Sequence, residues 1–224
     1  MMIATCTLKG SQGATTLALA LGTYSPASRR VVVEADLSGG DLSLRFGLPP
    51  TPGLVSLAAA SRRDSGSDVL LRHSHTLSDG MRIVLAPVEP ARCRAAVVAL
   101  VAAPASVLRA AANVPGTVVI LDFGRVDPDP PTLALLRLAD ALLVVTHRDS
   151  RGLTRLAAVA EEVRQWSPRP GLVVTGGGYP ADEITTVLGL PVFGSIPRRP
   201  SRKQLQRAVT ALAQRLQNRE GSVR

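Results

Sequence analysis

The chain has 224 residues, of which 46% are hydrophobic, 19% are charged and only 3% are aromatic. This composition allows a folded domain with a buried core, excludes an intrinsically disordered chain, and argues against binding of single-stranded nucleic acid by base stacking. The net charge is +9, and it is concentrated in residues 198–224, which carry seven Arg and one Lys against one Glu. The two cysteines, Cys6 and Cys93, are too few for a disulfide framework, which favours a reducing, cytoplasmic setting.

Short apolar runs alternate with helical segments along the chain. The apolar runs predict strands over residues 2–7, 30–35, 81–86, 117–121, 141–146, 172–175 and 192–195. Helices are predicted over residues 14–24, 91–112 with a break near Pro104, 152–166 with Ser150 as cap, 182–188 and 201–217. The proline-rich residues 127–131 predict a loop. The alternation is typical of an α/β fold, a mostly parallel sheet with helices on both faces.

A glycine-containing loop follows the first predicted strand and leads directly into a helix. It reads Lys9-Gly10-Ser11-Gln12-Gly13-Ala14-Thr15-Thr16. Backbone N–H groups in such a loop surround an anion, and the helix N-terminus adds its dipole. The phosphate-binding pattern GxxxxGK[ST] is incomplete, because Leu8 replaces its first glycine and Ala14 its lysine. On this loop alone, an ordinary β–α turn remains an alternative.

Two further predicted strands run into an aspartate. Asp36 follows the strand over residues 30–35, and Asp122 follows the strand over residues 117–121. Ligands bind beyond the carboxyl ends of parallel strands, so both carboxylates are expected on the same side as the loop. A carboxylate at that place orients water or reaches Mg²⁺. Each aspartate alone is more often a solvated strand end, but three such features in this order favour a nucleotide site.

These segments resemble the MinD/ParA group of deviant Walker ATPases. KGSQGATT resembles the family loop KGGxGKTT, and residues 34–48 resemble its second motif, DxDxxxGDLxLxLGL. Further similar segments are residues 119–122 (the Walker B strand), 139–146 and 188–197. Within the family the chain is most like pilus-locus members of the TadZ/CpaE type and septum-site relatives. The resemblance implies a P-loop NTPase fold over residues 1–200, with residues 201–224 as a basic helix and tail of the same domain.

The resemblance implies a role for each residue of the loop. Lys9 matches a signature lysine that reaches across a dimer to the partner's nucleotide. Gly10 and Gly13 match residues that cradle phosphates, Thr15 a Mg²⁺ ligand, and Thr16 a phosphate contact. The whole loop, including Ser11, Gln12 and Ala14, is thereby assigned to nucleotide binding.

The resemblance also implies roles for three residues outside the loop. Asp36 matches the carboxylate that positions the attacking water, so Asp36 and Lys9 are the candidate catalytic residues. Asp122 matches the Walker B residue that holds Mg²⁺ through water. Pro197 matches a residue on the adenine side. The implied cofactors are ATP and Mg²⁺.

Several positions depart from the family pattern. Ala14 removes a charged hydrogen bond worth roughly 1.5–3 kcal/mol, which would weaken nucleotide binding by one to two orders of magnitude and hydrolysis by more. Residues 176–178 are glycines in place of an adenine-reading turn with Asn, and Arg198 and Arg199 stand where an acidic residue is common. Arg125 offers a phosphate-facing charge, although a solvated loop arginine is the simpler interpretation. ATP turnover is therefore expected to be weak or absent.

The last predicted helix combines an apolar face with a basic surround. The apolar face consists of Leu205, Val209, Leu212 and Leu216, and the basic residues are Arg202, Lys203, Arg207, Arg215 and Arg219. Such a helix fits an anionic membrane surface, and clustered arginines fit non-specific DNA binding. The helix has no Trp or Phe anchor, which favours a third interpretation, in which the apolar face packs on the sheet.

The leading functional hypothesis is a cytoplasmic, homodimeric spatial regulator that binds nucleotide or is a pseudo-ATPase. It would recruit a protein partner in pilus assembly, cell division or chromosome partitioning, with peripheral contact to membrane or DNA left open. One alternative is an active Mg²⁺-dependent ATPase of the same family, in which Lys9 does the work of the missing lysine within a dimer. Another is an ATP-dependent ligase on the same fold, which would need an intact loop lysine and a second substrate pocket.

Overall fold

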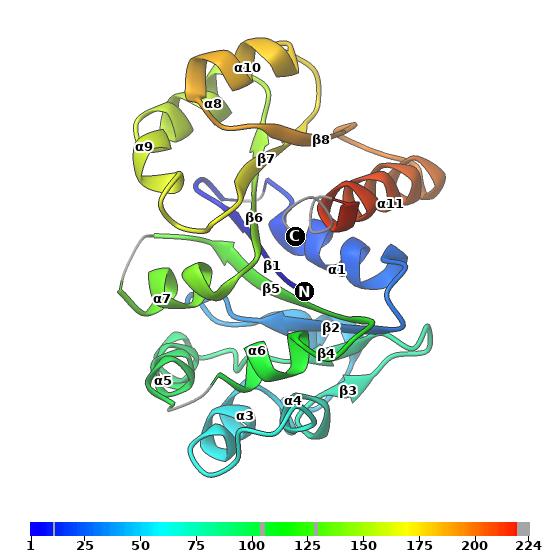
Figure 1. The fold of residues 1–224 in the computed structure, drawn as a ribbon, viewed down its shortest axis with the longest axis vertical. Coiled ribbons are helices and arrows are strands. Elements are labelled where there is room, and N and C mark those ends of the chain that lie inside the picture. Colours follow the sequence, from blue (N-terminus) through cyan, green and yellow to red (C-terminus); the bar gives the residue numbers. More distant parts are fainter. Residues whose placement is uncertain (11, 104–105, 128–129, 219–224) are drawn as a thin grey trace.

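The computed structural model describes residues 1–10, 12–103, 106–127 and 130–218. These residues contain an eight-stranded sheet in the order β3-β4-β2-β5-β1-β6-β7-β8 (Figure 1). All neighbouring strands are parallel except β3 and β4. The strands are β1 (Met2–Thr7), β2 (Arg29–Glu34), β3 (His75–Thr76), β4 (Arg82–Val84), β5 (Thr117–Arg125), β6 (Ala141–His147), β7 (Pro170–Thr175) and β8 (Val192–Ile196). The predicted fold class is confirmed.

Helices cover both faces of the sheet. One face is covered by α1 (Ala14–Tyr24), α2 (Leu42–Phe46) and α11 (Arg202–Asn218). The other face is covered by α3 (Leu54–Ser61), α4 (Val69–Arg72), α5 (Pro90–Ala102), α6 (Val107–Ala112), α7 (Pro130–Leu138), α8 (Ser150–Ala157), α9 (Ala160–Val163) and α10 (Ala181–Leu188). Figure 1 shows α11 alongside α1, on the opposite side of the sheet from α5 and α7. Among the described residues, every helix is too short or too polar to cross a bilayer.

The central strands are buried on both faces, which explains why they could be predicted from the sequence. Every side chain of β1 is buried, as is all of β5 except its last residue, Arg125. Met2 and Ala4 enter one core and Ile3 enters the other, because neighbouring side chains of a strand point to opposite faces. A doubly covered strand therefore has a continuous apolar run. The prediction over residues 117–121 was too short, because β5 continues through the aspartate that follows the run.

The helix predicted over residues 152–166 is two helices, α8 and α9. The prediction was also wrong about the cap: Ser150 lies inside α8, and the carboxylate of Asp149 accepts a hydrogen bond from the N–H of Gly152 at 2.8 Å. The break follows a change in backbone hydrogen bonding, since the N–H of Val159 donates to Leu156, three residues back, at 3.1 Å. The amphipathic pattern continues across this turn, so periodicity alone did not reveal it.

The short helix α10 and the short strand β8 were predicted, but several other short elements were not. The loop predicted over residues 127–131 was wrong at its C-terminal end, because α7 begins at Pro130. Residues 128–129 lie outside the described residues. Proline is compatible with the first turn of a helix, where its missing N–H has no partner to lose. The sequence pattern also missed α2, α3, α4 and β3. None exceeds eight residues, and helices of that length depend on tertiary packing.

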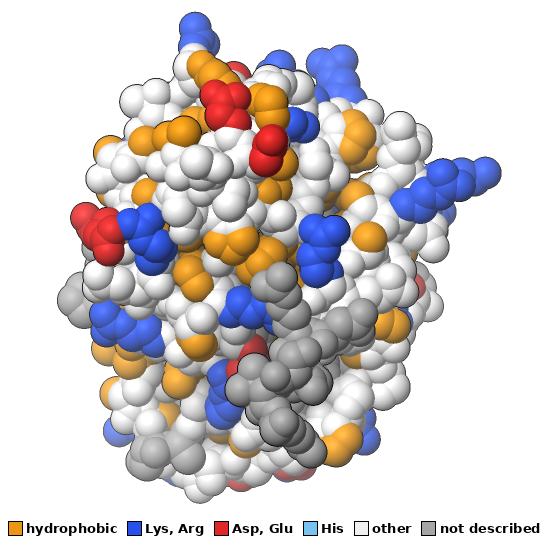
Figure 2. Space-filling model, turned by 45° about the horizontal axis from the view of Figure 1, so that its top comes forward, with side chains coloured by type: hydrophobic (Ala, Val, Ile, Leu, Met, Phe, Trp, Pro, Cys, Tyr) orange, Lys and Arg blue, Asp and Glu red, His pale blue; other side chains and the backbone are white. Residues whose placement is uncertain are grey.

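The apolar face of α11 is covered by the rest of the fold. Val209, Leu212 and Leu216 are buried beside α1 and β8, while Arg202, Lys203 and Arg207 are exposed. The guanidinium of Arg169 donates to the carbonyl oxygens of Arg215 and Leu216 at 2.9 and 2.7 Å, which satisfies the end of the helix. Figure 2 shows basic side chains spread over one face of the molecule rather than gathered in a single patch.

Because α11 completes the core, Leu212→Ala is expected to lower the free energy of unfolding by roughly 2–5 kcal/mol. The matched control is Arg207→Ala, an exposed position on the same helix, where the change should stay within about 0.5 kcal/mol. Urea unfolding measures both. Equal stability of the two variants would contradict the packing described for this helix.

Candidate functional site

A short loop joins β1 to α1 at the carboxyl edge of the sheet. The hydroxyl of Thr7, the last residue of β1, lies 2.6 Å from Oε1 of Gln12 and 2.8 Å from the carbonyl oxygen of Lys9. Gly13 precedes the helix with a φ of 100°, a conformation that favours glycine. A Cβ added to Gly10 or Gly13 would meet no atom within 4 Å. The backbone of the loop therefore faces open space.

The loop forms one wall of a pocket of about 600 Å³. The other walls come from the ends of β2 and β5, which are neighbours in the sheet. The lining residues are Thr7, Gly10, Gln12, Gly13, Ala14, Thr15, Thr16, Asp36, Ser38, Gly124 and Arg125. The structure therefore brings most of the predicted loop together with Asp36. Ser11, also assigned to the site, lies outside the described residues.

Asp122 lies at this edge of the sheet, with 1% of its surface exposed. Its Oδ1 accepts a hydrogen bond from the N–H of Gly124 at 3.0 Å, and the hydroxyl of Thr15 bonds to the same carboxyl group. The pKa of Asp122 is raised to about 7, chiefly by burial and further by the negative charges of Glu34 and Asp36. A cation beside this carboxylate would stabilise its charged form.

Asp36 is held at the edge of the pocket by backbone groups. Its Oδ1 accepts a hydrogen bond from the N–H of Ser38 at 2.8 Å, and the backbone N–H of Arg125 donates to its carboxyl group. Gly124 has a φ of 54°, and a Cβ at this position would collide with the carboxylate of Asp36. Burial raises the pKa of Asp36, although these hydrogen bonds and the charge of Arg125 oppose the shift. The end of β5 thus holds Asp36 at the edge of the pocket.

Glu34 orders the segment that carries Asp36, a role that the sequence analysis did not assign. Oε1 accepts hydrogen bonds from the N–H groups of Asp41 and Leu42 at 2.8 and 3.1 Å, and Oε2 from the N–H of Ala86 at 2.8 Å. Burial raises the pKa of Glu34, and the three hydrogen bonds oppose that rise. The only signal in the sequence was its place two residues before Asp36 in the second motif.

A second cavity of about 270 Å³ adjoins the loop and contains Pro197. It shares Gln12, Gly13 and Thr16 with the first pocket. His147 and Thr175 also line it, with Nδ1 of His147 2.6 Å from Oγ1 of Thr175. Both residues lie at the carboxyl ends of predicted strands, as Asp36 and Asp122 do, but the sequence analysis did not propose them as site residues. Lys9 is exposed and lines neither cavity in the described part of the chain.

The oxygen atoms around the loop fit a hard divalent cation that is held together with a phosphate. Mg²⁺ prefers oxygen ligands and is usually bound by one or two protein groups plus phosphates and water. Thr15 and Asp122 supply a hydroxyl and a carboxylate that already contact each other. In the described residues no group of three or more His, Cys, Asp or Glu forms a cage for a metal.

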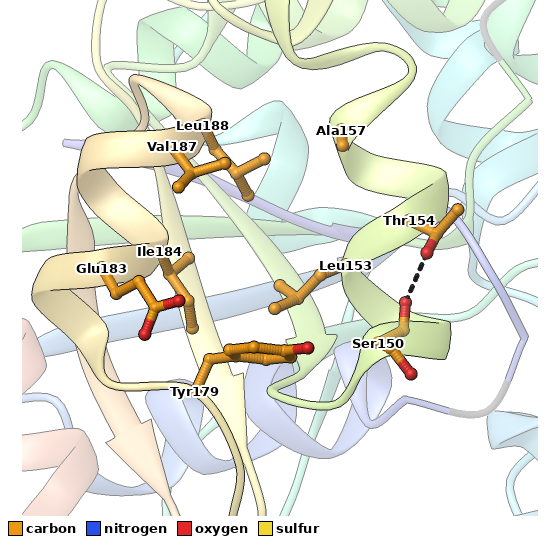
Figure 3. Close-up of a pocket in the computed structure, with 9 residues that line it drawn as sticks. All are labelled: Ser150, Leu153, Thr154, Ala157, Tyr179, Glu183, Ile184, Val187 and Leu188. Carbon is orange, nitrogen blue, oxygen red and sulfur yellow. Dashed lines mark hydrogen bonds between the residues drawn. The ribbon is translucent and has the colours of Figure 1, made fainter.

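A third hollow, of about 240 Å³, lies between α8 and α10 and shares no residue with the loop pocket (Figure 3). Its walls are Leu153 and Ala157 of α8 and Ile184, Val187 and Leu188 of α10. Tyr179 closes one end, and Glu183 is the charged residue among those that line it. An apolar lining of this kind does not suit a phosphate.

No family model and no curated protein matches the chain. Solved structures do match it, and they identify its fold. A ParA family ATPase from Chlorobium tepidum TLS matches with a TM-score of 0.70 and 17% identity over 97% of each chain. The Pyrococcus furiosus cell division ATPase MinD matches with a TM-score of 0.69 and 19% identity over 97% of this chain and 98% of that chain. The chain has the MinD/ParA fold.

The MinD/ParA fold also extends to a ligand-bound enzyme. Cobyrinic acid a,c-diamide synthase from Mycobacterium smegmatis, solved with an ATP analogue and magnesium, matches with a TM-score of 0.66 and 22% identity over 100% of this chain and 96% of that chain. The resemblance to the MinD/ParA group is therefore confirmed for the fold. The finer likeness to TadZ/CpaE-type members stays a prediction.

Proposed function

We propose that this protein is a nucleotide-binding spatial regulator of the MinD/ParA type, with slow or absent ATP hydrolysis. The observation that carries the proposal is the loop pocket, which is lined by an open glycine loop and Asp36 but has Ala14 at the lysine position, with Asp122 buried at the same edge of the sheet. Such a pocket keeps the parts that bind phosphate and loses the part that stabilises charge during phosphoryl transfer.

In this proposal the loop pocket takes the phosphates and the adjoining cavity takes the base. Backbone N–H groups from Gly10 to Thr16 would bind phosphate oxygens, and Pro197 would lie against the base. Thr15 and Asp122 would hold Mg²⁺, which would supply positive charge to the phosphates. Asp36 would accept a hydrogen bond from the attacking water. The pocket of about 600 Å³ and the cavity of about 270 Å³ share the loop residues Gln12, Gly13 and Thr16, which supports this division.

The proposed regulator acts as a homodimer that recruits a protein partner of a pilus, division or partitioning machine. Lys9 is exposed beside the loop, as a side chain that reaches a second subunit must be. Contact with an anionic membrane or with DNA would be electrostatic and would use Arg202, Lys203 and Arg207. Insertion of the apolar face of α11 into lipid is disfavoured, because that face is buried in the core.

Calorimetric titration of ATP with Mg²⁺ tests the proposal. The wild type is expected to bind, and Lys9→Ala should weaken binding at least tenfold by removing a charged contact with the phosphates. Lys203→Ala is the matched control, since Lys203 is the other lysine of the chain and is exposed on α11. No binding by the wild type at millimolar ATP would overturn the proposal.

Phosphate release separates the alternatives. Mg²⁺-dependent turnover that Asp36→Ala abolishes would favour an active ATPase. The likeness to a diamide synthase gives a ligase some support, and turnover that appears only with an added carboxylic acid and an amine donor would favour it. Binding without turnover supports the regulator.

A further inference from the structure

The loop pocket is lined by a cation that does not come from the loop. Among the described residues that line the pocket, Arg125 is the positively charged one. Ala14 brings no charge, and Lys9 lies outside the lining. The nearby carboxylates of Asp36 and Asp122 would repel phosphates, so an anion in this pocket needs a compensating cation.

Arg125 lines the loop pocket from the end of β5, as Asp36 does from the segment after β2. It is the last residue of β5 and pairs in register with Thr7, the last residue of β1 before the loop. Its backbone N–H donates to the carboxyl group of Asp36, and its positive charge lowers the pKa of that group. Arg125 therefore lies at the rim of the loop pocket near the carboxylate proposed to position water, and together with Asp127 it also lines a smaller cavity of about 70 Å³.

The guanidinium of Arg125 is not committed to a strong partner. Its Nη2 lies 3.5 Å from Oδ2 of Asp127, and the two side chains are 54% and 72% exposed. An exposed ion pair of this kind contributes little to stability. A guanidinium has five N–H donors in a planar fork that matches two phosphate oxygens at once. Most of these donors would remain available to a ligand.

We propose that Arg125 replaces the missing loop lysine and binds the β- or γ-phosphate of a nucleoside di- or triphosphate. The inference rests on the proposed function, since it names the residue that gives this site its affinity for phosphates. The positive charge comes from the end of β5 instead of from the first residue of α1. The pocket thus retains a cation for the phosphates although the position after Gly13 has none.

The test compares ATP, ADP and inorganic tripolyphosphate, each titrated with Mg²⁺ into the wild type, Arg125→Ala and Arg125→Lys. Arg125→Ala is expected to lose roughly 10- to 100-fold in affinity for all three, because the contact is with phosphates and not with the base. Arg125→Lys should recover part of the loss. Arg63→Ala, an exposed arginine outside the pocket, is the control and should bind as the wild type does. Asp127→Ala, which removes the competing carboxylate, should bind as tightly as the wild type or more so.

Two results would overturn the inference. One is unchanged ATP and tripolyphosphate affinity in Arg125→Ala while the wild type binds. The other is a loss of affinity that comes with a lowered unfolding midpoint and is not relieved by Arg125→Lys, which would assign Arg125 a structural role. Failure of the wild type itself to bind ATP would instead overturn the proposed function, so the two failures are distinguishable.

Discussion

Asp122→Asn is expected to make the ligand-free protein more stable at pH 8 and to remove most of the fall in stability between pH 4 and pH 8. The folded-state pKa of Asp122 is about 7, against an ordinary value of 3.8. Between these values the folded protein holds a proton that the unfolded chain has released, so stability decreases as pH rises towards 7. At about 1.4 kcal/mol per pKa unit, the loss is on the order of 4 kcal/mol.

Denaturant unfolding at pH 5 and pH 8 measures this effect. Asparagine has the shape of the protonated aspartate and can still accept the hydrogen bond from Gly124, so the variant should behave as the low-pH form at every pH. Glu34 and Asp36 also have raised pKa values and leave a residual dependence. Asp127→Asn, at an exposed carboxylate on the same strand end, is the control and should follow the wild type. An unchanged pH dependence in Asp122→Asn would contradict the prediction.

Ala14→Lys is expected to raise the affinity for Mg²⁺-ATP by roughly 10- to 100-fold and to increase turnover by a larger factor. Ala14 lines the loop pocket but is only 3% exposed, and a lysine at this position is expected to extend towards the proposed phosphates. The new ammonium group would form a charged hydrogen bond worth roughly 1.5–3 kcal/mol in the bound state. It would also stabilise charge that develops in phosphoryl transfer, which is why turnover should gain more than affinity.

Titration and phosphate release measure the two gains, and Ala14→Met is the matched control of similar length without charge. The gain should also reduce the need for Arg125, so Arg125→Ala should cost less affinity in the Ala14→Lys background than alone. If Ala14→Lys and Ala14→Met behaved alike, the pocket would not be a phosphate site of the expected kind.

The strands that are buried on both faces could be predicted from the sequence. Residues 2–7 and 141–146 are continuous apolar runs because both faces of β1 and β6 are covered, and such runs need no neighbour to be recognised. The short helices between residues 42 and 72 were missed because so few turns produce no clear periodicity. The turn between α8 and α9 was missed for the opposite reason, since the pattern continues across it.

The candidate site could likewise be predicted only in part from the sequence. Asp36 and Asp122 were predicted from their position after apolar runs, and the structure places Asp36 in the loop pocket and Asp122 against Thr15. The sequence showed Glu34 only as one residue of the second motif. Its structural role could not be predicted, because its three hydrogen bonds come from segments up to 52 residues away. The orientation of Lys9 and of Arg125 was also beyond the sequence pattern.

By itself, the amino-acid sequence determined the alternation of strands and helices, the order of the strand-end carboxylates and the absence of the loop lysine. These features depend on local composition and on positions along one strand. Only the tertiary structure decided that α11 buries its apolar face, that Gly124 lies close against the carboxylate of Asp36, and that Arg125 shares the pocket with Ala14. The physical reason is that such contacts join segments far apart in the chain, and their charges and distances exist only once the sheet brings β1, β2 and β5 side by side.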